Sequence, residues 1–281
     1  MNSFSVIDPV FFELGPIAVH WYGVIIALGI YIAVTLADKE ATRKGYRKDF
    51  IIDLVMWVLP IAFLGARLYY VVFNLNYYLA HPEEIIQIWN GGIAIYGGLL
   101  AGAATAYWFC KKEGVSFALF LDIAAPVVLL AQAMGRWGNF INQEAHGGEV
   151  SRAFLESLFL PNWIIEQMNI NGVYYQPTFL YESVWSAIGV ILLLVLRRRK
   201  HLLRVGDIAI IYTMWYSFGR FFIEGLRTDS LMMFGLIRVS QALSIVLFIG
   251  ALIVWWLRSR RIPEYPYYDE VTDPKSRLLL G

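Results

Sequence analysis

The sequence predicts an all-α membrane protein with seven transmembrane helices and a small extracytoplasmic head region between the fourth and fifth helices. Three observations support this prediction. Of the 281 residues, 58% are hydrophobic and 16% are charged, whereas a soluble domain is about half apolar and a quarter charged. The apolar residues gather in stretches of about 20 residues, the length that crosses a bilayer core. Most basic residues fall on one predicted side of these stretches, as the positive-inside rule requires.

Seven stretches are long and apolar enough to cross a membrane. They cover residues 18–37, 51–73, 92–110, 118–137, 179–196, 206–224 and 236–257, within one predicted membrane domain, 1–257. Residues 138–178 are too many for a structureless loop, so we expect them to fold as the outer head. The acidic, tyrosine-rich tail 258–281 is predicted to be cytoplasmic and disordered.

The distribution of lysine and arginine predicts the orientation. Seventeen of the 23 basic residues fall in loops 38–50, 111–117 and 197–205 and in the tail. Because cytoplasmic loops are enriched in basic residues, these loops are expected inside, with the N-terminus outside and the C-terminus inside. The N-terminus has no basic region or cleavage site typical of a signal peptide, so the first stretch is expected to stay in the membrane.

The other six basic residues are all arginines on the predicted outer side. They are Arg67, Arg136, Arg152, Arg220, Arg227 and Arg238. Topology accounts for the cytoplasmic basic residues but not for these six. Arginine carries a planar fork of donors that binds carboxylate or phosphate bidentately, and lipid phosphate is the abundant anion at this depth. We therefore expect an anion site in the outer third of the membrane.

Polar residues from all seven stretches are predicted to lie at this depth. They include His20, Tyr22, Arg67, Tyr96, Arg136, Tyr181, Glu182, Tyr216, Arg220, Glu224, Arg238 and Gln241. Ionisable residues inside a membrane are costly and usually face a cavity or a partner. Arg220 and Glu224, four residues apart, form either a structural ion pair or a pair in which Glu224 orients Arg220 toward a phosphate. Arg136 either snorkels to the interface or belongs to the same site.

Several classes of protein have no support in the sequence. HExxH, GxSxG and P-loop motifs are absent, which argues against a zincin, a serine hydrolase and an ATPase. The single cysteine, Cys110, rules out an internal disulfide. No metal, cofactor or nucleic-acid partner is predicted. A lipid or anion transporter needs polar groups on both sides of the midplane, whereas here they are confined to the outer third. A non-catalytic lipid receptor would not need acid and phenol groups beside the arginines. Both alternatives are therefore less favoured than an enzyme.

Six motifs carry a resemblance to a known family. They are HWYG (20–23), FLGARLYYVVF (63–73), WNGGIAIYGG (89–98), GRWGNFINQEAHGG (135–148), QPTFLYE (176–182) and YSFGRFFIEGLR (216–227). In this order they resemble the phosphatidylglycerol–prolipoprotein diacylglyceryl transferases of bacteria, over about residues 8–257. The stretch 135–148 matches the signature of that family.

The resemblance implies an enzyme of the bacterial cytoplasmic membrane. Such enzymes move the diacylglyceryl group of phosphatidylglycerol to the cysteine thiol of a prolipoprotein and release glycerol phosphate. The cysteine lies in a lipobox just after the signal peptide of the precursor. The family has seven spans and an outer N-terminus, and it uses neither metal nor nucleotide.

The expected site residues follow from this chemistry and from the matched motifs. Two arginines at the phosphodiester would bind the head group and stabilise the charge of the leaving phosphate, and we assign Arg136 and Arg220 to this role. Glu224 and Tyr96 are the other catalytic candidates. The substrate-binding candidates that the resemblance adds are Asn139, Glu144, Gly147, Tyr22, His20, Tyr181 and Arg67.

The group that takes the thiol proton is left open. Some relatives have histidine where Tyr96 stands here, and a phenol, with an ordinary pKa of about 10, is a poor base unless a cation lowers that value. Either Tyr96 is tuned by an arginine, or it only positions the substrate. Glu144, Glu224 and His146 are the other candidates.

Overall fold

The computed structural model describes residues 6–15, 17–228, 232–233, 237–261 and 265–276. The chain forms two compact units. Unit 1 contains residues 1–36 and 121–270, and unit 2 contains residues 37–120 and 271–281. The divisions fall inside helices α1 (Trp21–Arg43) and α5 (Phe117–Ile141), where no change of composition marks them. Sequence reasoning therefore expected a single domain.

Unit 2 is built on the close packing of α2 (Phe50–Phe73) against α4 (Ile95–Glu113). A Cβ atom added at Gly97 would lie 2.4 Å from the backbone oxygen of Gly65 and 2.3 Å from Cβ of Tyr69. Only glycine allows the two backbones to approach this closely. The helices are connected by α3 (Leu75–Ala80) and the short 3-10 helices η1 (Pro82–Glu84) and η2 (Ile88–Asn90).

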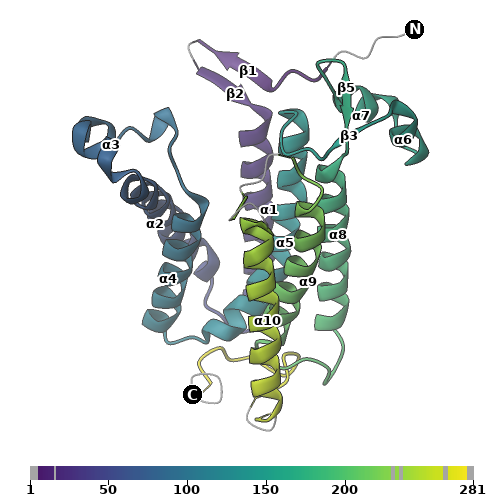
Figure 1. Ribbon diagram of the computed structural model, residues 1–281. Helices are drawn as coiled ribbons and strands as arrows, with labels where there is room; N and C mark the ends of the chain where they lie inside the picture. Colours follow the sequence, from purple (N-terminus) through teal and green to yellow (C-terminus); the bar gives the residue numbers. More distant parts are fainter. Residues whose placement is uncertain (1–5, 16, 229–231, 234–236, 262–264, 277–281) are drawn as a thin grey trace. The chain divides into compact units, whose positions relative to one another are not determined.

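Unit 1 contains the long helices α8 (Thr178–Arg197), α9 (Asp207–Glu224) and α10 (Val239–Ser259) with most of α1 and α5. Figure 1 shows α5, α8, α9 and α10 running alongside one another. Each of the seven apolar stretches thus forms a long helix. Among the described residues, five helices are long and apolar enough to cross a membrane, namely α1, α2, α5, α8 and α10.

The all-α prediction missed several short strands. Strands β1 (Val10–Leu14) and β2 (Ile17–His20) form an antiparallel hairpin before α1. Strands β3 (Glu149–Val150), β4 (Asn169–Ile170) and β5 (Val173–Tyr175) form an antiparallel sheet in the order β3-β5-β4, and β6 (Met232–Met233) pairs with β7 (Ile237–Arg238). Strands of two to five residues are too short to show a readable alternation of apolar and polar residues.

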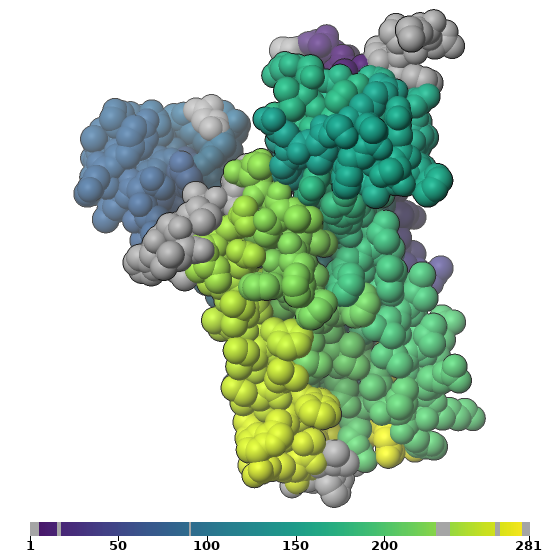
Figure 2. Space-filling view, turned by 45° about the vertical axis from the view of Figure 1, so that its right-hand side comes forward, coloured from purple at the N-terminus to yellow at the C-terminus, as the bar shows by residue number. Residues whose placement is uncertain are grey.

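Residues 142–177, here called the head, fold as a small subdomain at one end of the unit 1 helices (Figure 2). Besides the three-stranded sheet, the head contains α6 (Arg152–Ser157) and α7 (Asn162–Gln167). Its core consists of Leu155, Ile164, Ile165 and Met168 packed with Phe140 of α5 and Phe179 of α8. A folded head has its own apolar core, as expected for a connection too long to remain without structure.

Buried Gln167 connects the head to the end of α5. Its Nε2 donates to the backbone oxygens of Phe140 (3.3 Å) and Ile141 (3.1 Å), and its Oε1 accepts from the backbone nitrogen of Ile7 (2.8 Å). The last carbonyl groups of a helix have no partner within the helix. Gln167 therefore satisfies these carbonyls and fixes the point at which α5 stops, immediately after the predicted site residues Arg136 and Asn139.

The prediction of a disordered tail is wrong for residues 265–276. In unit 1 the backbone nitrogen of Tyr268 donates to Leu203, and Tyr268 is 1% exposed. The guanidinium of Arg258 lies 4.0 Å from the ring centroid of Tyr265, a favourable cation–π contact. In unit 2 the carbonyl of Pro274 accepts from Ser116. The acidic composition suggested solvation, but the aromatic rings provide the surface that packs.

Candidate active site

Arg136, Glu182, Arg220, Glu224 and Arg227 form a continuous cluster of alternating charges in unit 1, here called the arginine–glutamate cluster. Nε of Arg136 lies 2.9 Å from Oε2 of Glu182, and Nη1 of Arg220 lies 2.9 Å from Oε1 of the same carboxylate. Nη2 of Arg220 also lies 2.5 Å from Oε2 of Glu224. One carboxylate of α8 therefore joins the arginine of α5 to the arginine of α9.

Glu182 is the residue that sequence reasoning did not assign to the site. It was expected among the polar residues of the outer third, but no role followed because its partners lie on other helices. A signal was available: Glu182 is the only acidic residue of α8, an otherwise apolar helix. An acid in such a helix is costly and indicates a partner or a function.

Tryptophans and glycines position Glu182 opposite Arg220. Trp185 of α8 and Trp215 of α9 stack with ring centroids 4.2 Å apart, and each indole nitrogen donates to the backbone oxygen of the other tryptophan. A Cβ at Gly219 would lie 2.2 Å from the Trp185 ring, and one at Gly189 would lie 2.4 Å from the Trp215 ring. This reciprocal contact fixes the register of α8 against α9 one turn from Glu182 and next to Arg220.

One arginine of the cluster is within reach of an external group. Three arginines face two glutamates, and Nη1 of Arg227 lies 3.9 Å from Oε2 of Glu224. Glu182 is 7% exposed and Glu224 is 3% exposed, whereas the side chain of Arg136 is 23% exposed. An external group can therefore reach Arg136. Because a guanidinium binds phosphate or carboxylate through several donors, the reachable Arg136 is suited to bind an anion.

A chain of amide contacts extends the cluster into the head. Nη1 of Arg136 donates to Oδ1 of Asn139 (3.3 Å), and Nδ2 of Asn139 donates to Oε1 of Glu144 (3.0 Å). Asn142 also donates to Glu144, over 3.4 Å. The predicted residues Arg136, Asn139 and Glu144 are thus brought together.

The loop that follows α5 is held in an unusual conformation. Gln143 and Ala145 have φ values of 53° and 58°, in a left-handed region that residues other than glycine rarely occupy. The carbonyl of Ala145 accepts from Oγ1 of Thr178 (2.7 Å), and the nitrogen of Gly147 donates to Gln176 (3.0 Å). A Cβ at Gly147 would lie 2.7 Å from the Gln176 side chain, so glycine is required at this close approach.

The other predicted residues of unit 1 lie at the ends of its helices. Tyr22, in the first turn of α1, packs against α5, because a Cβ at Gly138 would lie 2.6 Å from its ring. Tyr181 precedes Glu182 on α8 and is partly buried. His20, the last residue of β2, is exposed. Tyr22 therefore lies against Gly138, two residues after Arg136 on α5, while the substrate contacts of Tyr22, His20 and Tyr181 remain predictions.

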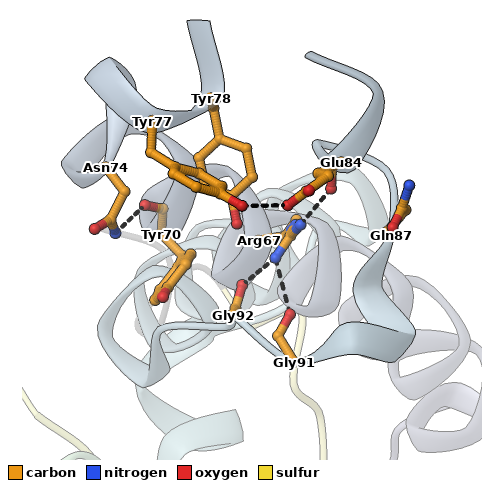
Figure 3. Close-up of a pocket in the computed structure, with 9 residues that line it drawn as sticks. All are labelled: Arg67, Tyr70, Asn74, Tyr77, Tyr78, Glu84, Gln87, Gly91 and Gly92. Carbon is orange, nitrogen blue, oxygen red and sulfur yellow. Dashed lines mark hydrogen bonds between the residues drawn. The ribbon is translucent and has the colours of Figure 1, made fainter. Parts of the chain in front are cut away.

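Arg67 lies in unit 2, where backbone carbonyls surround it (Figure 3). Its Nε donates to Ile85 (2.9 Å), its Nη1 to Gly91 (2.8 Å) and Gly92 (2.7 Å), and its Nη2 to Glu84 (2.6 Å). A Cβ at Gly92 would lie 2.5 Å from Nη1 of Arg67. Arg67 therefore holds the 84–92 segment against α2, and its proposed contact with substrate remains a prediction.

The carbonyl-bound Arg67 lines a cavity of about 380 Å³ with Tyr70, Asn74, Tyr77 and other residues of the α2–α4 connection (Figure 3). The hydroxyl of Tyr77 donates to the Glu84 carboxylate over 2.8 Å, and this bond raises the pKa of the Tyr77 phenol. Tyr96, in the first turn of α4, is partly buried and also belongs to unit 2. Tyr96 remains a catalytic candidate on sequence grounds.

A sequence profile described as prolipoprotein diacylglyceryl transferase matches residues 9–257. The chain belongs to this family. It is 54% identical over 265 residues to the phosphatidylglycerol–prolipoprotein diacylglyceryl transferase of Bacillus licheniformis, covering 94% of this chain and 97% of the relative. The enzyme of the same name from Bacillus velezensis is 56% identical over 252 residues, or 90% and 92% of the two chains. That of Lactobacillus acidophilus is 52% identical over 268 residues, or 95% of each chain. The resemblance of the six motifs is thereby confirmed.

Proposed function

We propose that the protein transfers the diacylglyceryl group of phosphatidylglycerol to the lipobox cysteine of a prolipoprotein, forming a thioether and releasing glycerol phosphate. This is the first step of bacterial lipoprotein maturation. Membership of the family and the names of its relatives support the reaction. The single structural observation that carries it is the bridge from Arg136 through Glu182 to Arg220, because it fixes two guanidinium groups beside each other where an anion can be held.

The arginine–glutamate cluster is proposed to bind the phosphodiester. Arg136 and Arg220 contact its oxygens, while Glu182 and Glu224 hold the two guanidinium planes in place. The thiolate attacks the glycerol carbon that bears the phosphodiester oxygen, so a C–S bond forms as the C–O bond breaks. Charge then develops on the departing phosphate. Donors fixed in advance at the position of developing charge are an effective source of catalysis in a site that excludes water.

The residues around the cluster are proposed to define the head-group site. Asn139 and Glu144 continue the contacts of Arg136, and Gly147 keeps the head close to α8. Tyr22 and Tyr181 line the entrance at the ends of α1 and α8. Tyr96, His20 and Arg67 lie in motifs that match the family, and we propose on this ground that they contact the substrates.

The membrane arrangement is proposed to have seven spans, with α4 and α9 crossing in addition to the five more apolar helices. Helices of 19 and 18 residues are long enough to cross the bilayer core when other helices cover their polar faces. The head and the arginine–glutamate cluster are then extracytoplasmic, together with the N-terminus. The basic loops around residues 38–50 and 197–205 are cytoplasmic, as the positive-inside rule favours.

The reaction is tested with purified protein in detergent, phosphatidylglycerol and a synthetic peptide with a lipobox cysteine. The expected result is a peptide whose mass rises by one diacylglyceryl group, with release of glycerol phosphate in equal amount. A peptide with serine in place of the cysteine is expected to stay unmodified, because an alcohol ionises far less readily than a thiol. Binding of phosphatidylglycerol without transfer at any pH would instead favour a lipid receptor or transporter.

A further inference from the structure

His146 lies beside the arginine–glutamate cluster but has no part in it. It shares a small pocket with Asn139 and Glu144, the residues that extend the contacts of Arg136. Its ring packs on Tyr175 of β5 with centroids 4.1 Å apart. The imidazole is therefore held within the wall of the proposed head-group site.

The backbone on both sides of His146 is fixed. The carbonyl of Ala145 accepts from Thr178, and the nitrogen of Gly147 donates to Gln176. Gly147 also forms a backbone bridge to Arg227 of the arginine–glutamate cluster. Because the backbone is fixed on both sides, His146 loses little conformational freedom when it reacts. An effective general base needs to be positioned in this way.

The hydrogen bond of His146 determines its tautomer. Nδ1 lies 3.1 Å from the carbonyl oxygen of Gly147. Because a carbonyl oxygen only accepts, Nδ1 carries the proton in the neutral ring, and the lone pair is on Nε2. This is the arrangement that a neutral histidine needs in order to act as a general base.

The carboxylates of unit 1 that could also act as the base already have partners. Glu224 contacts Arg220 and Arg227, and Glu182 joins Arg136 to Arg220. Glu144 accepts from two asparagine amides. Within the described part of the chain, the charged and titratable groups around His146 are Tyr175 of β5, Glu144 of its own loop and Arg227, whose backbone pairs with Gly147. None of these contacts involves Nε2 of His146.

We infer that His146 is the general base that removes the proton from the lipobox thiol. This inference rests on the proposed function. Nε2 takes the proton of the S–H group, and the sulfur keeps the electron pair with which it attacks the glycerol carbon. The electrons of the broken C–O bond remain on the phosphate. The imidazolium then returns its proton to the departing glycerol phosphate or to water, which restores the neutral ring.

His146→Asn removes Nε2 but keeps an amide donor near the position of Nδ1. At neutral pH the variant is expected to lose about 100-fold in kcat, within the usual contribution of a general base, with KM for phosphatidylglycerol unchanged. The rate is expected to recover as pH rises toward about 8.5, where free thiols ionise. A peptide with selenocysteine in place of cysteine is also expected to restore it, since a selenol ionises without a base at neutral pH.

His81→Asn is the matched control. His81 also bonds a carbonyl through Nδ1, that of Tyr77 (3.2 Å), and stacks on the ring of Tyr77, but it lies in unit 2, outside the proposed site. Its variant is expected to keep wild-type rates at every pH. Two results would overturn the inference: a wild-type pH profile for His146→Asn, or a loss that neither alkaline pH nor selenocysteine relieves. Failure of the wild-type protein to transfer would instead reject the proposed function.

Discussion

Arg136→Lys is expected to lower transfer nearly as far as Arg136→Ala, by about 100-fold in kcat/KM, the usual cost of removing one donor to a developing anion. Lysine keeps the charge but presents a single ammonium group. Arg136 must bind Glu182 through Nε, Asn139 through Nη1 and a phosphate oxygen at the same time. Only the planar fork of arginine holds three acceptors in fixed directions. The measurement is kcat/KM for peptide lipidation by the wild type and both variants.

Arg152→Lys is the control for this substitution. Arg152 lies in the head and forms ion pairs with Glu156 and Glu166, but its side chain is 40% exposed. Exposed ion pairs contribute little to stability, so this variant is expected to keep nearly all activity. Full activity of Arg136→Lys would show that charge alone is sufficient at this position and would remove the argument for bidentate binding.

Glu182→Gln is expected to abolish transfer and to destabilise the protein. Without the carboxylate, Arg136 and Arg220 lose their shared anchor, and the arginine–glutamate cluster loses one negative charge. Removing one partner of a buried ion pair typically costs about 3 kcal/mol or more. The measurements are kcat/KM and the thermal unfolding midpoint in detergent, with and without phosphatidylglycerol.

Added phosphatidylglycerol separates the two effects of Glu182→Gln. A bound phosphate supplies negative charge to the unpaired arginines, so the lipid is expected to raise the midpoint of the variant more than that of the wild type. Glu166→Gln is the control, because it makes the same chemical change to a carboxylate of the head that lies outside the cluster. If Glu182→Gln unfolds at the wild-type temperature and transfers at the wild-type rate, the bridging role of Glu182 is wrong.

The long helices could be predicted from the sequence because their signal is local. Each apolar stretch of about 20 residues forms a long helix, since burial of such a stretch depends mainly on its own composition. The short strands and the ordered tail could not be predicted. Pairing of Glu149 with Tyr175 joins residues far apart in sequence, and burial of Tyr268 depends on the 201–205 turn that it packs against.

The site could be predicted only in part, because only some of its contacts are local in the sequence. The Arg220–Glu224 pair follows from a spacing of four residues on one helix, and the structure confirms that contact. The role of Glu182 depends on the contact of α8 with α9, which the stacked Trp185 and Trp215 fix. The single acid of α8 indicates that Glu182 has a partner or a function, but the sequence of α8 does not show which arginines it meets. Arg67 was predicted to contact the substrate, but its guanidinium donates to four backbone carbonyls. No sequence pattern marks these carbonyls.

Calorimetric titration of detergent-solubilised protein with short-chain phosphatidylglycerol tests most directly whether the arginine–glutamate cluster holds the phosphodiester. Wild type, Arg136→Lys and Arg220→Lys are compared, with short-chain diacylglycerol, which lacks the phosphate, as the matched ligand. We predict that both variants bind phosphatidylglycerol at least 10-fold more weakly than the wild type, roughly 1.4 kcal/mol, and bind diacylglycerol equally well. Wild-type affinity of both variants for phosphatidylglycerol would contradict the account, because the phosphate would then be held elsewhere.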